Sequence, residues 1–221
     1  MPSTASEDLA QLANEANRVG WATGRLTCRN IELAAAALRW SAVENRRGDA
    51  GASVLRPIAS DSAHPASISA LVGSARQPLH TDGAHLRRPP RWVVLHAEQP
   101  NDTPTLLCRL RRSAGKGATV PATADGGVFK VTNGQDRFLS TLWTDATGWR
   151  WDPGCMQPGD QRAREAAQFL ASLEDQCEQH DWTESNQVLV IDNRQMLHAR
   201  ADATADPDRV LARLSYDQAE A

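Results

Sequence analysis

The chain has 221 residues, 41% of them hydrophobic, and a formal net charge of −3 at pH 7. This composition is typical of an ordinary globular core, and without any basic run the charge argues against a nucleic-acid partner. The longest apolar runs are far shorter than a membrane span and the N-terminus lacks the basic and apolar regions of a signal peptide, so we expect a cytoplasmic protein without a membrane partner.

The four cysteines are scattered along the chain without Cys-x-x-Cys spacing. They are Cys28, Cys108, Cys155 and Cys177. This pattern suits a reducing compartment better than a disulfide framework or a zinc site. No internal repeat and no linker divides the chain, so residues 1–221 are predicted to form a single domain.

Two helices are predicted near the start of the chain. The first begins at Ser6, whose hydroxyl can cap the first turn, and ends at Gly20. The second, at about 31–43, is alanine-rich. Neither carries residues with obvious chemistry, so both are expected to buttress a sheet. A polar loop follows, and short strands are predicted at 54–57 and 67–72.

The first candidate site residues stand in the sequence His80-Thr-Asp82. If this segment is a strand, side chains two positions apart point the same way, so His80 and Asp82 could hold one metal ion. Two further histidines lie close in sequence. His85 would face the opposite side from Asp82, and His96, at the end of an apolar strand over 91–96, is interpreted as a structural histidine.

The middle of the chain alternates short strands with turn signals. Strands are predicted at 106–110, 128–131, 138–143 and 148–151. Asn133-Gly134 between two of them is a strong hairpin signal. The segment 111–127 is poor in apolar residues and is predicted to be a long loop. Residues 160–180 keep the apolar spacing of an amphipathic helix with a charged outer face.

Residues 188–214 are interpreted as a β-hairpin near the end of the chain. An apolar run leads to His198, turn-forming residues follow, and a second strand begins at Arg209. Along that strand Arg209, Leu211 and Arg213 would share one face. Two arginines on an apolar face are costly unless each meets an anion. The stretch therefore indicates a metal ligand beside an anion clamp.

The element order favours one fold class and one kind of metal site. Many short strands separated by turns, with flanking helices, predict a mainly β, double-stranded β-helix (jelly roll) rather than a βαβ fold. His80, Asp82 and His198 would together form the two-histidine, one-carboxylate triad of non-haem Fe(II) oxygenases, which leaves three coordination positions open.

These motifs resemble one known family. His80-Thr-Asp82, His198, Arg209 and Arg213 resemble the motif of Fe(II)/2-oxoglutarate-dependent dioxygenases of the taurine dioxygenase/TfdA (clavaminate synthase-like) family. The segments 150–153 and 192–194 also resemble it, and the likeness covers about residues 55–216. The family usually has a Gly-Gly-x-Thr element whose Thr contacts 2-oxoglutarate. Residues 101–105 replace it here; Thr105 fits the spacing better, and Thr103 is the alternative.

The resemblance implies an oxidoreductase that uses Fe(II), O2 and 2-oxoglutarate as cosubstrate, and releases succinate and CO2. His80, Asp82 and His198 would hold the iron. Arg209 would bind the far carboxylate of 2-oxoglutarate. Arg213 would face the anionic end of the substrate or the iron-bound end of 2-oxoglutarate.

The same resemblance bears on the substrate and on the loop that closes over it. The substrate would be a small, anionic molecule such as an amino acid or a biosynthetic intermediate. Because Asp82 is a carboxylate and leaves no position for a halide, hydroxylation, desaturation or cyclisation is favoured over halogenation. The family commonly closes a loop over its substrate, so residues 111–127 are expected to act as a lid.

Other interpretations stand beside this one. A related barrel with a Zn site would need a third histidine ligand, for which His85 and His96 are poorly placed. In a metal-free binding protein His80 and His198 would be ordinary polar residues, although paired inward arginines argue against that class. For Arg213, the alternative is an ion pair with one of the chain's aspartates.

Overall fold

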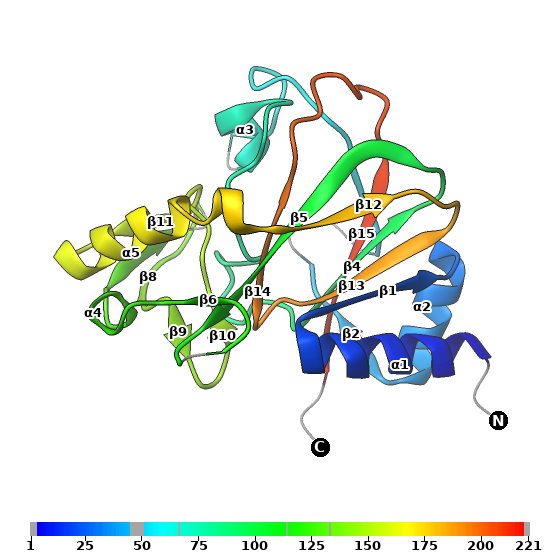
Figure 1. Ribbon diagram of the computed structural model, residues 1–221, viewed down its shortest axis with the longest axis horizontal. Helices are drawn as coiled ribbons and strands as arrows, with labels where there is room; N and C mark the ends of the chain where they lie inside the picture. Colours follow the sequence, from blue (N-terminus) through cyan, green and yellow to red (C-terminus); the bar gives the residue numbers. More distant parts are fainter. Residues whose placement is uncertain (1–3, 45–50, 66, 114, 133, 219–221) are drawn as a thin grey trace.

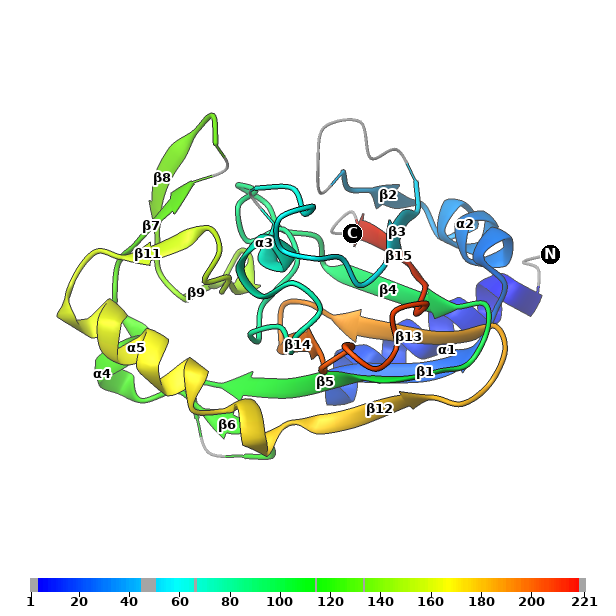
Figure 2. The same ribbon diagram turned by 90° about the horizontal axis from the view of Figure 1, so that it is seen from above.

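The computed structural model describes residues 4–44, 51–65, 67–113, 115–132 and 134–218. Its main part consists of two antiparallel sheets (Figures 1 and 2). The major sheet has the order β1-β13-β4-β15-β2, with β3 added beside β15. Its strands are β1 (Trp21–Arg25), β2 (Trp40–Ala42), β3 (Ser53–Leu55), β4 (Trp92–Ala97), β13 (Gln187–Asp192) and β15 (Leu211–Gln218).

The minor sheet has the order β12-β5-β14. It consists of β5 (Asn101–Arg111), β12 (Glu178–Trp182) and β14 (Met196–Arg200), and the short β6 (Ala118–Thr119) runs parallel to β5. A cluster of buried side chains joins the two sheets. Leu95, Leu189 and Ile191 of the major sheet pack there with Leu107 and Trp182 of the minor sheet. The sheets therefore face one another across a shared core, as in a jelly roll.

Smaller strands and helices complete the fold. The strands are β7 (Phe129–Thr132), β8 (Arg137–Ser140) and β11 (Met156–Pro158) in one sheet, and the pair β9 (Trp143–Thr144) and β10 (Gly148–Trp149). The helices are α1 (Thr4–Val19), α2 (Cys28–Ala37), α3 (Ile68–Val72), α4 (Ala122–Asp125), α5 (Gln161–Ala171) and the 3-10 turn η1 (Glu174–Gln176). None of the helices among the described residues has the length and apolar character needed to cross a membrane.

The helices α1 and α2 cover the outer face of the major sheet, as expected. Leu9 of α1 and Ile31 of α2 are fully buried against Val188 and Val190 of β13. Leu189 and Ile191 of the same strand point to the opposite side, into the core between the sheets. Because β13 is buried on both faces, its residues 188–191 are all apolar and do not alternate with polar ones.

Both predicted N-terminal helices are present, with different ends. The first is α1, which starts at Thr4 instead of Ser6 and has Gly20 just beyond it at a positive φ of 107°. The second starts earlier, because the Thr27 hydroxyl accepts a hydrogen bond from the Asn30 backbone N–H. It ends at Ala37, since Arg39 adopts a positive φ of 58° and the chain then enters β2.

Two predicted elements are of a different type. The segment 67–72, expected to be a strand, is the short helix α3. The predicted helix 160–180 ends at Ala171, and its last residues form β12. Along β12 His180 and Trp182 are buried while Asp181 between them is exposed, and this period of two is that of a strand on a sheet.

The predicted hairpin over 188–214 is wrong. β13 and β15 both pair with β4 in the major sheet, whereas β14 pairs with β5 in the minor sheet. A tight turn, in which Gln195 N donates to Asp192 O at 2.9 Å, sends the chain from one sheet to the other. Residues 201–210 then carry it back. His198 and Arg213 therefore come from opposite sheets.

Candidate metal centre and substrate cavity

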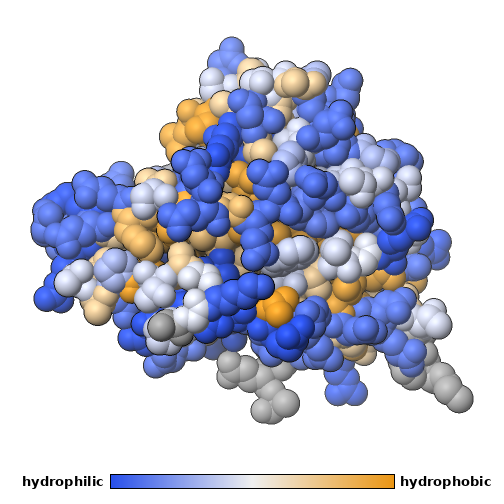
Figure 3. Space-filling model, viewed as in Figure 1, coloured by the Kyte–Doolittle hydropathy of each residue, from blue (hydrophilic) through white to orange (hydrophobic). Residues whose placement is uncertain are grey.

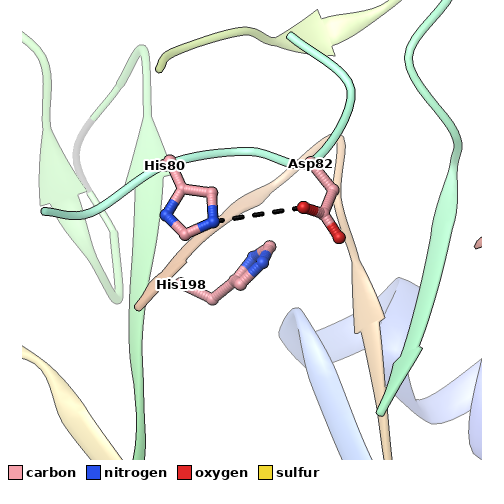
Figure 4. Close-up of side chains that lie close together, drawn as sticks. All are labelled: His80, Asp82 and His198. Atoms are coloured by element: carbon pink, nitrogen blue, oxygen red, sulfur yellow. Dashed lines mark ion pairs between the residues drawn. The ribbon is translucent and has the colours of Figure 1, made fainter. Parts of the chain in front are cut away.

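His80, Asp82 and His198 meet at one buried point. One ligand atom from each of the three lies within 4.8 Å of the others. His80 Nε2 is 4.0 Å from Asp82 Oδ1, and the two imidazole rings have centroids 4.7 Å apart. Figure 4 shows both rings and the carboxylate converging on the same space. The three residues predicted to ligate a metal are thus brought together.

The expected strand at His80 is only a single bridge. His80 and His198 exchange two backbone hydrogen bonds of 3.0 and 2.9 Å, which place the first histidine directly beside β14. The chain then turns, and Asp82 lies in that turn rather than in a strand. His80 Nδ1 lies 2.9 Å from the carbonyl oxygen of Pro78, which leaves Nε2 for the centre.

Hydrogen bonds from two other segments fix the turn that carries Asp82. The Asn193 side chain accepts from Asp82 N and donates to Asp82 O, both at 2.9 Å. Arg150 is 3% exposed, and its guanidinium donates to the carbonyl oxygens of Ala84, Leu86 and Arg87. The sequence motifs contain both residues, but their bracing role was not predicted.

The protonation states suit a divalent cation. Burial, followed by repulsion from His80, lowers the pKa of His198 to about 3, so its imidazole is neutral at pH 7. Burial by itself would raise the pKa of Asp82, but the charge and hydrogen bond of Arg213 together with the two histidines outweigh it, and the pKa lies below its ordinary value. A neutral histidine and an ionised carboxylate are the forms that bind metal.

Two polar atoms of the centre have no protein partner. His198 Nδ1 and Asp82 Oδ2 are buried without a hydrogen bond to any described residue. A buried polar atom in this state costs free energy, which a bound ion or ligand would offset. The residues therefore fit a metal site of the facial-triad type.

A cavity of about 740 Å³ opens beside the centre. Its walls come from both sheets and from residues between 52 and 69; we call the stretch that contains them, 52–75, the wall segment. The other lining residues include the three candidate ligands, Thr105, Asp152, Arg200, Arg209 and Arg213. Ile58 and Leu71, in the wall segment, are exposed hydrophobic residues. Figure 3 shows hydrophobic side chains gathered around α3 on a mostly hydrophilic face.

Arg209 has the surroundings expected of an anion site. It is 4% exposed, and its Nε donates a long hydrogen bond of 3.4 Å to the Thr103 carbonyl oxygen. No carboxylate of the described residues lies within ion-pair distance of it. Burial and the neighbouring charge of Arg200 lower the pKa of Arg209 to about 10, so it remains charged at pH 7. A buried cation in this setting calls for an anionic ligand.

Of the two candidate threonines, Thr105 is the one that lines the cavity. Its Oγ1 accepts a hydrogen bond of 3.1 Å from Trp182 Nε1, so the hydroxyl proton is free to be donated. The Thr103 hydroxyl donates instead to Asp206 Oδ2 at 2.8 Å. Both residues lie within β5, which begins at Asn101, earlier than the strand predicted at 106–110.

Arg213 lines the same cavity but is paired with Asp82. Its Nη1 lies 2.9 Å from Asp82 Oδ1. The structure therefore contains the ion pair with an aspartate that was the alternative expectation for Arg213, and this aspartate is itself a candidate metal ligand. Leu211, between the two arginines, lines the cavity as well, so the expected shared face of 209, 211 and 213 is present.

Arg200 is a cavity residue that the sequence analysis missed. It stands two residues after His198 on β14, opposite Thr105 on β5. Its Nη2 donates to the carbonyl oxygens of Gly73 and Ala75 at 2.8 and 2.7 Å. Arg200 thus ties the strand of a candidate ligand to the end of the wall segment.

The rival histidines do not join the metal cluster. His96 is buried on β4, and desolvation lowers its pKa. His85 lines the cavity apart from the three candidate ligands.

The segment 111–127, expected to act as a lid, also lies away from the cavity. Residues 111–127 form β6 and α4 far from α3 (Figure 1), and none of their described members lines the cavity. Residues of the wall segment, and not the described residues of 111–127, line the cavity.

Comparisons with known proteins show that this chain is similar in fold to several solved structures. No family model and no curated protein matches the sequence. Among solved structures, an asparagine oxygenase in complex with Fe(II), 2S,3S-3-hydroxyasparagine and succinate has a TM-score of 0.71 and 16% identity, over 98% of this chain and 80% of that chain. The non-heme iron oxygenase OrfP in complex with Fe and alpha-ketoglutaric acid has a TM-score of 0.69 and 16% identity, over 99% and 81%.

A further OrfP complex, with Fe, succinate and (3S)-hydroxy-L-Arg, has a TM-score of 0.69 and 17% identity, over 99% and 81% of the two chains. These neighbours are an asparagine oxygenase with bound Fe(II) and a non-heme iron oxygenase. The predicted fold class is thereby confirmed: the chain has a mainly β, jelly-roll fold like that of these oxygenases.

Proposed function

We propose that this protein is an Fe(II)- and 2-oxoglutarate-dependent oxygenase that hydroxylates a small anionic substrate, with an amino acid as the best candidate. One observation carries the proposal. A buried cluster of His80, Asp82 and His198 shares a cavity with Arg209, a buried cation that has no carboxylate partner among the described residues. A metal site beside an anion site is what this chemistry requires.

The three candidate ligands would hold the iron through one nitrogen of each histidine and the Asp82 carboxylate. Arg213 occupies Asp82 Oδ1, so Oδ2 is the oxygen free to bind. Bound Fe(II) would supply the redox chemistry that converts 2-oxoglutarate and O2 to succinate, CO2 and an oxidised substrate. Because Asp82 is present as a carboxylate, hydroxylation, desaturation or cyclisation fits better than halogenation.

The protein's own residues bind and orient the two organic molecules. Arg209 would receive the far carboxylate of 2-oxoglutarate through a planar pair of N–H donors, and the Thr105 hydroxyl would add a third. Arg213, which is paired with Asp82 in the same cavity, would face the anionic group of the substrate. The wall segment would keep water out of the cavity while both are bound.

The neighbours support an amino acid as the substrate class. The similar structures contain 2S,3S-3-hydroxyasparagine and (3S)-hydroxy-L-Arg. The cavity in this chain presents cations from both sheets, which suits a substrate with a carboxylate. We further infer that the protein acts in the cytoplasm, in keeping with its four free cysteines.

The decisive experiment is anaerobic addition of Fe(II) and then 2-oxoglutarate to the metal-free protein. The expected result is a visible charge-transfer band from the chelate, which disappears with formation of succinate when O2 is admitted. His198→Ala should show no band. His85→Gln, a cavity residue outside the cluster, should show the band at wild-type strength. Absence of the band in the wild-type protein would favour a binding protein without oxygenase activity.

A further inference from the structure

Two cysteines lie close together outside the candidate metal centre. The register pairs Glu178 of β12 with Leu107 of β5, so Cys177, the residue just before β12, lies opposite Cys108 of β5. Both side chains pack in the same core cluster, and Cys177 Sγ donates a hydrogen bond of 3.4 Å to the Leu173 carbonyl oxygen. Directly opposed residues have Cβ atoms about 4.5–5.5 Å apart, and a disulfide needs about 3.5–4.5 Å, so only a small approach separates the pair from a bond.

The two thiols differ in reactivity. Contact with the Cys108 thiol, followed by the charge of Arg76, lowers the pKa of Cys177, although burial and Glu174 act against this. The same contact and its own burial raise the pKa of Cys108. Cys177 is also the more exposed of the two. Cys177 is therefore the more accessible thiol and lies near the cation of Arg76, whereas Cys108 is buried.

We propose that Cys108 and Cys177 form a peroxide-sensitive thiol pair. The Cys177 thiolate attacks a hydroperoxide, the O–O bond breaks, and the products are a sulfenic acid on Cys177 and an alcohol or water. The Cys108 thiol then displaces the sulfenic oxygen as water and the S–S bond forms. Both sulfurs are oxidised and the hydroperoxide is reduced, so electrons and atoms balance.

The pair lies on the far side of β5 from the cavity. Thr105 lines the cavity, whereas Cys108, an odd number of residues away, points to the core beneath α5. A disulfide here would tie the strand β12 to β5 without entering the metal centre. The site is therefore independent of the proposed oxygenase activity.

The test uses the reduced, metal-free, full-length protein in the presence of a chelator and an equimolar amount of hydrogen peroxide. The expected result is loss of two free thiols per chain and one cross-linked peptide pair, joining Cys108 to Cys177, in an unreduced digest. The double variant Cys28→Ser/Cys155→Ser is the matched control and should form the same cross-link. A wild-type digest with no cross-link, or with a bond to Cys28 or Cys155, overturns the proposal.

Single variants test the order of the two steps. In Cys108→Ser, Cys177 should accumulate as a sulfenic acid that dimedone traps. In Cys177→Ser, Cys108 should remain unlabelled over the same time. Equal labelling of Cys108 in Cys177→Ser would overturn the assignment of Cys177 as the attacking thiol. The wild-type digest needs no substitution, so it decides the cross-link even where a variant folds poorly.

Discussion

Nη1 of Arg213 lies 2.9 Å from Oδ1 of Asp82, so an arginine of the major sheet is joined to a candidate metal ligand beside the minor sheet. The side chains of the pair are 16% and 6% exposed. Removing one partner of a buried ion pair leaves the other charge desolvated and alone. Arg213 therefore links three properties: the stability of the fold, the ionisation of Asp82 and the charge that a substrate would meet.

We expect Arg213→Gln to separate these properties. The metal-free variant should lose about 3 kcal/mol of unfolding free energy, measured by urea denaturation, because Asp82 loses its cation. Conversion of 2-oxoglutarate to succinate without substrate should persist, while the stimulation by an amino acid falls by about tenfold or more. If the variant instead loses 2-oxoglutarate binding, Arg213 belongs to the cosubstrate and the case for an anionic substrate is lost.

Replacing any one of the three candidate ligands should abolish iron binding. His80→Ala, Asp82→Ala and His198→Ala each remove a ligand from a centre that has only three, so both affinity and geometry are lost. Bound iron after dialysis and far-UV circular dichroism test metal loss and folding separately. His85→Gln is the control and should retain iron. Full iron content in His198→Ala would contradict the ligand set.

Arg209→Ala should raise the KM for 2-oxoglutarate by at least about tenfold. A hydrogen bond to a charged group contributes about 1.5–3 kcal/mol, and 1.4 kcal/mol corresponds to a factor of ten. Arg209→Lys should restore part of the loss, since an ammonium cannot form a planar fork. Arg56→Gln, at an exposed arginine of the same cavity, is the control. An unchanged KM in Arg209→Ala would show that the cosubstrate binds elsewhere.

Arg200→Gln should loosen the end of the wall segment. Its Nη2 donates to Gly73 O and Ala75 O, and these hydrogen bonds to a charged donor disappear in the variant. Hydrogen exchange should become faster for backbone amides of 68–77, with no change in α1. Arg200→Lys should give an intermediate rate. Equal exchange in wild type and Arg200→Gln would show that the segment is held by its other contacts.

The metal-free protein should become less stable in mild acid. Burial lowers the pKa of His180 in the folded state, with the charge of Asp181 acting against it. The unfolded chain therefore binds a proton more readily, so this contribution is complete above about pH 6.5 and is lost as the pH falls. The thermal midpoint should fall between about pH 7.5 and pH 5.5. The fall should be smaller in His180→Gln and unchanged in His64→Gln, at an exposed position.

The meeting of His80, Asp82 and His198 could be predicted from the sequence because the signals for it are local. His198 follows an apolar run that can only be a buried strand, and His80 and Asp82 stand close enough to share an ion whether or not they lie in a strand. Arg209 is predicted by the cost of a buried charge. In each case residue type and spacing carry the information.

The features that were missed depend on distant parts of the chain. Whether 201–210 closes a hairpin or crosses between sheets is decided by the pairing of β14 with β5 and of β15 with β4, which no local pattern records. The residues of 67–72, three small and three aliphatic, suit a strand or a helical turn equally. Arg200 and Asn193 act on backbone carbonyl and amide groups, which have no sequence signature.

The wall segment is held near each of its ends by contacts that involve only a few residues. At one end Leu55 pairs with Leu211 on β15, and at the other Gly73 and Ala75 are held by Arg200. The three candidate metal ligands all lie outside it. Exchange of residues 56–72 is therefore a route to new selectivity: a library confined to this stretch would reshape the substrate's surroundings, while the candidate metal centre and the catalytic step proposed for it would stay unchanged.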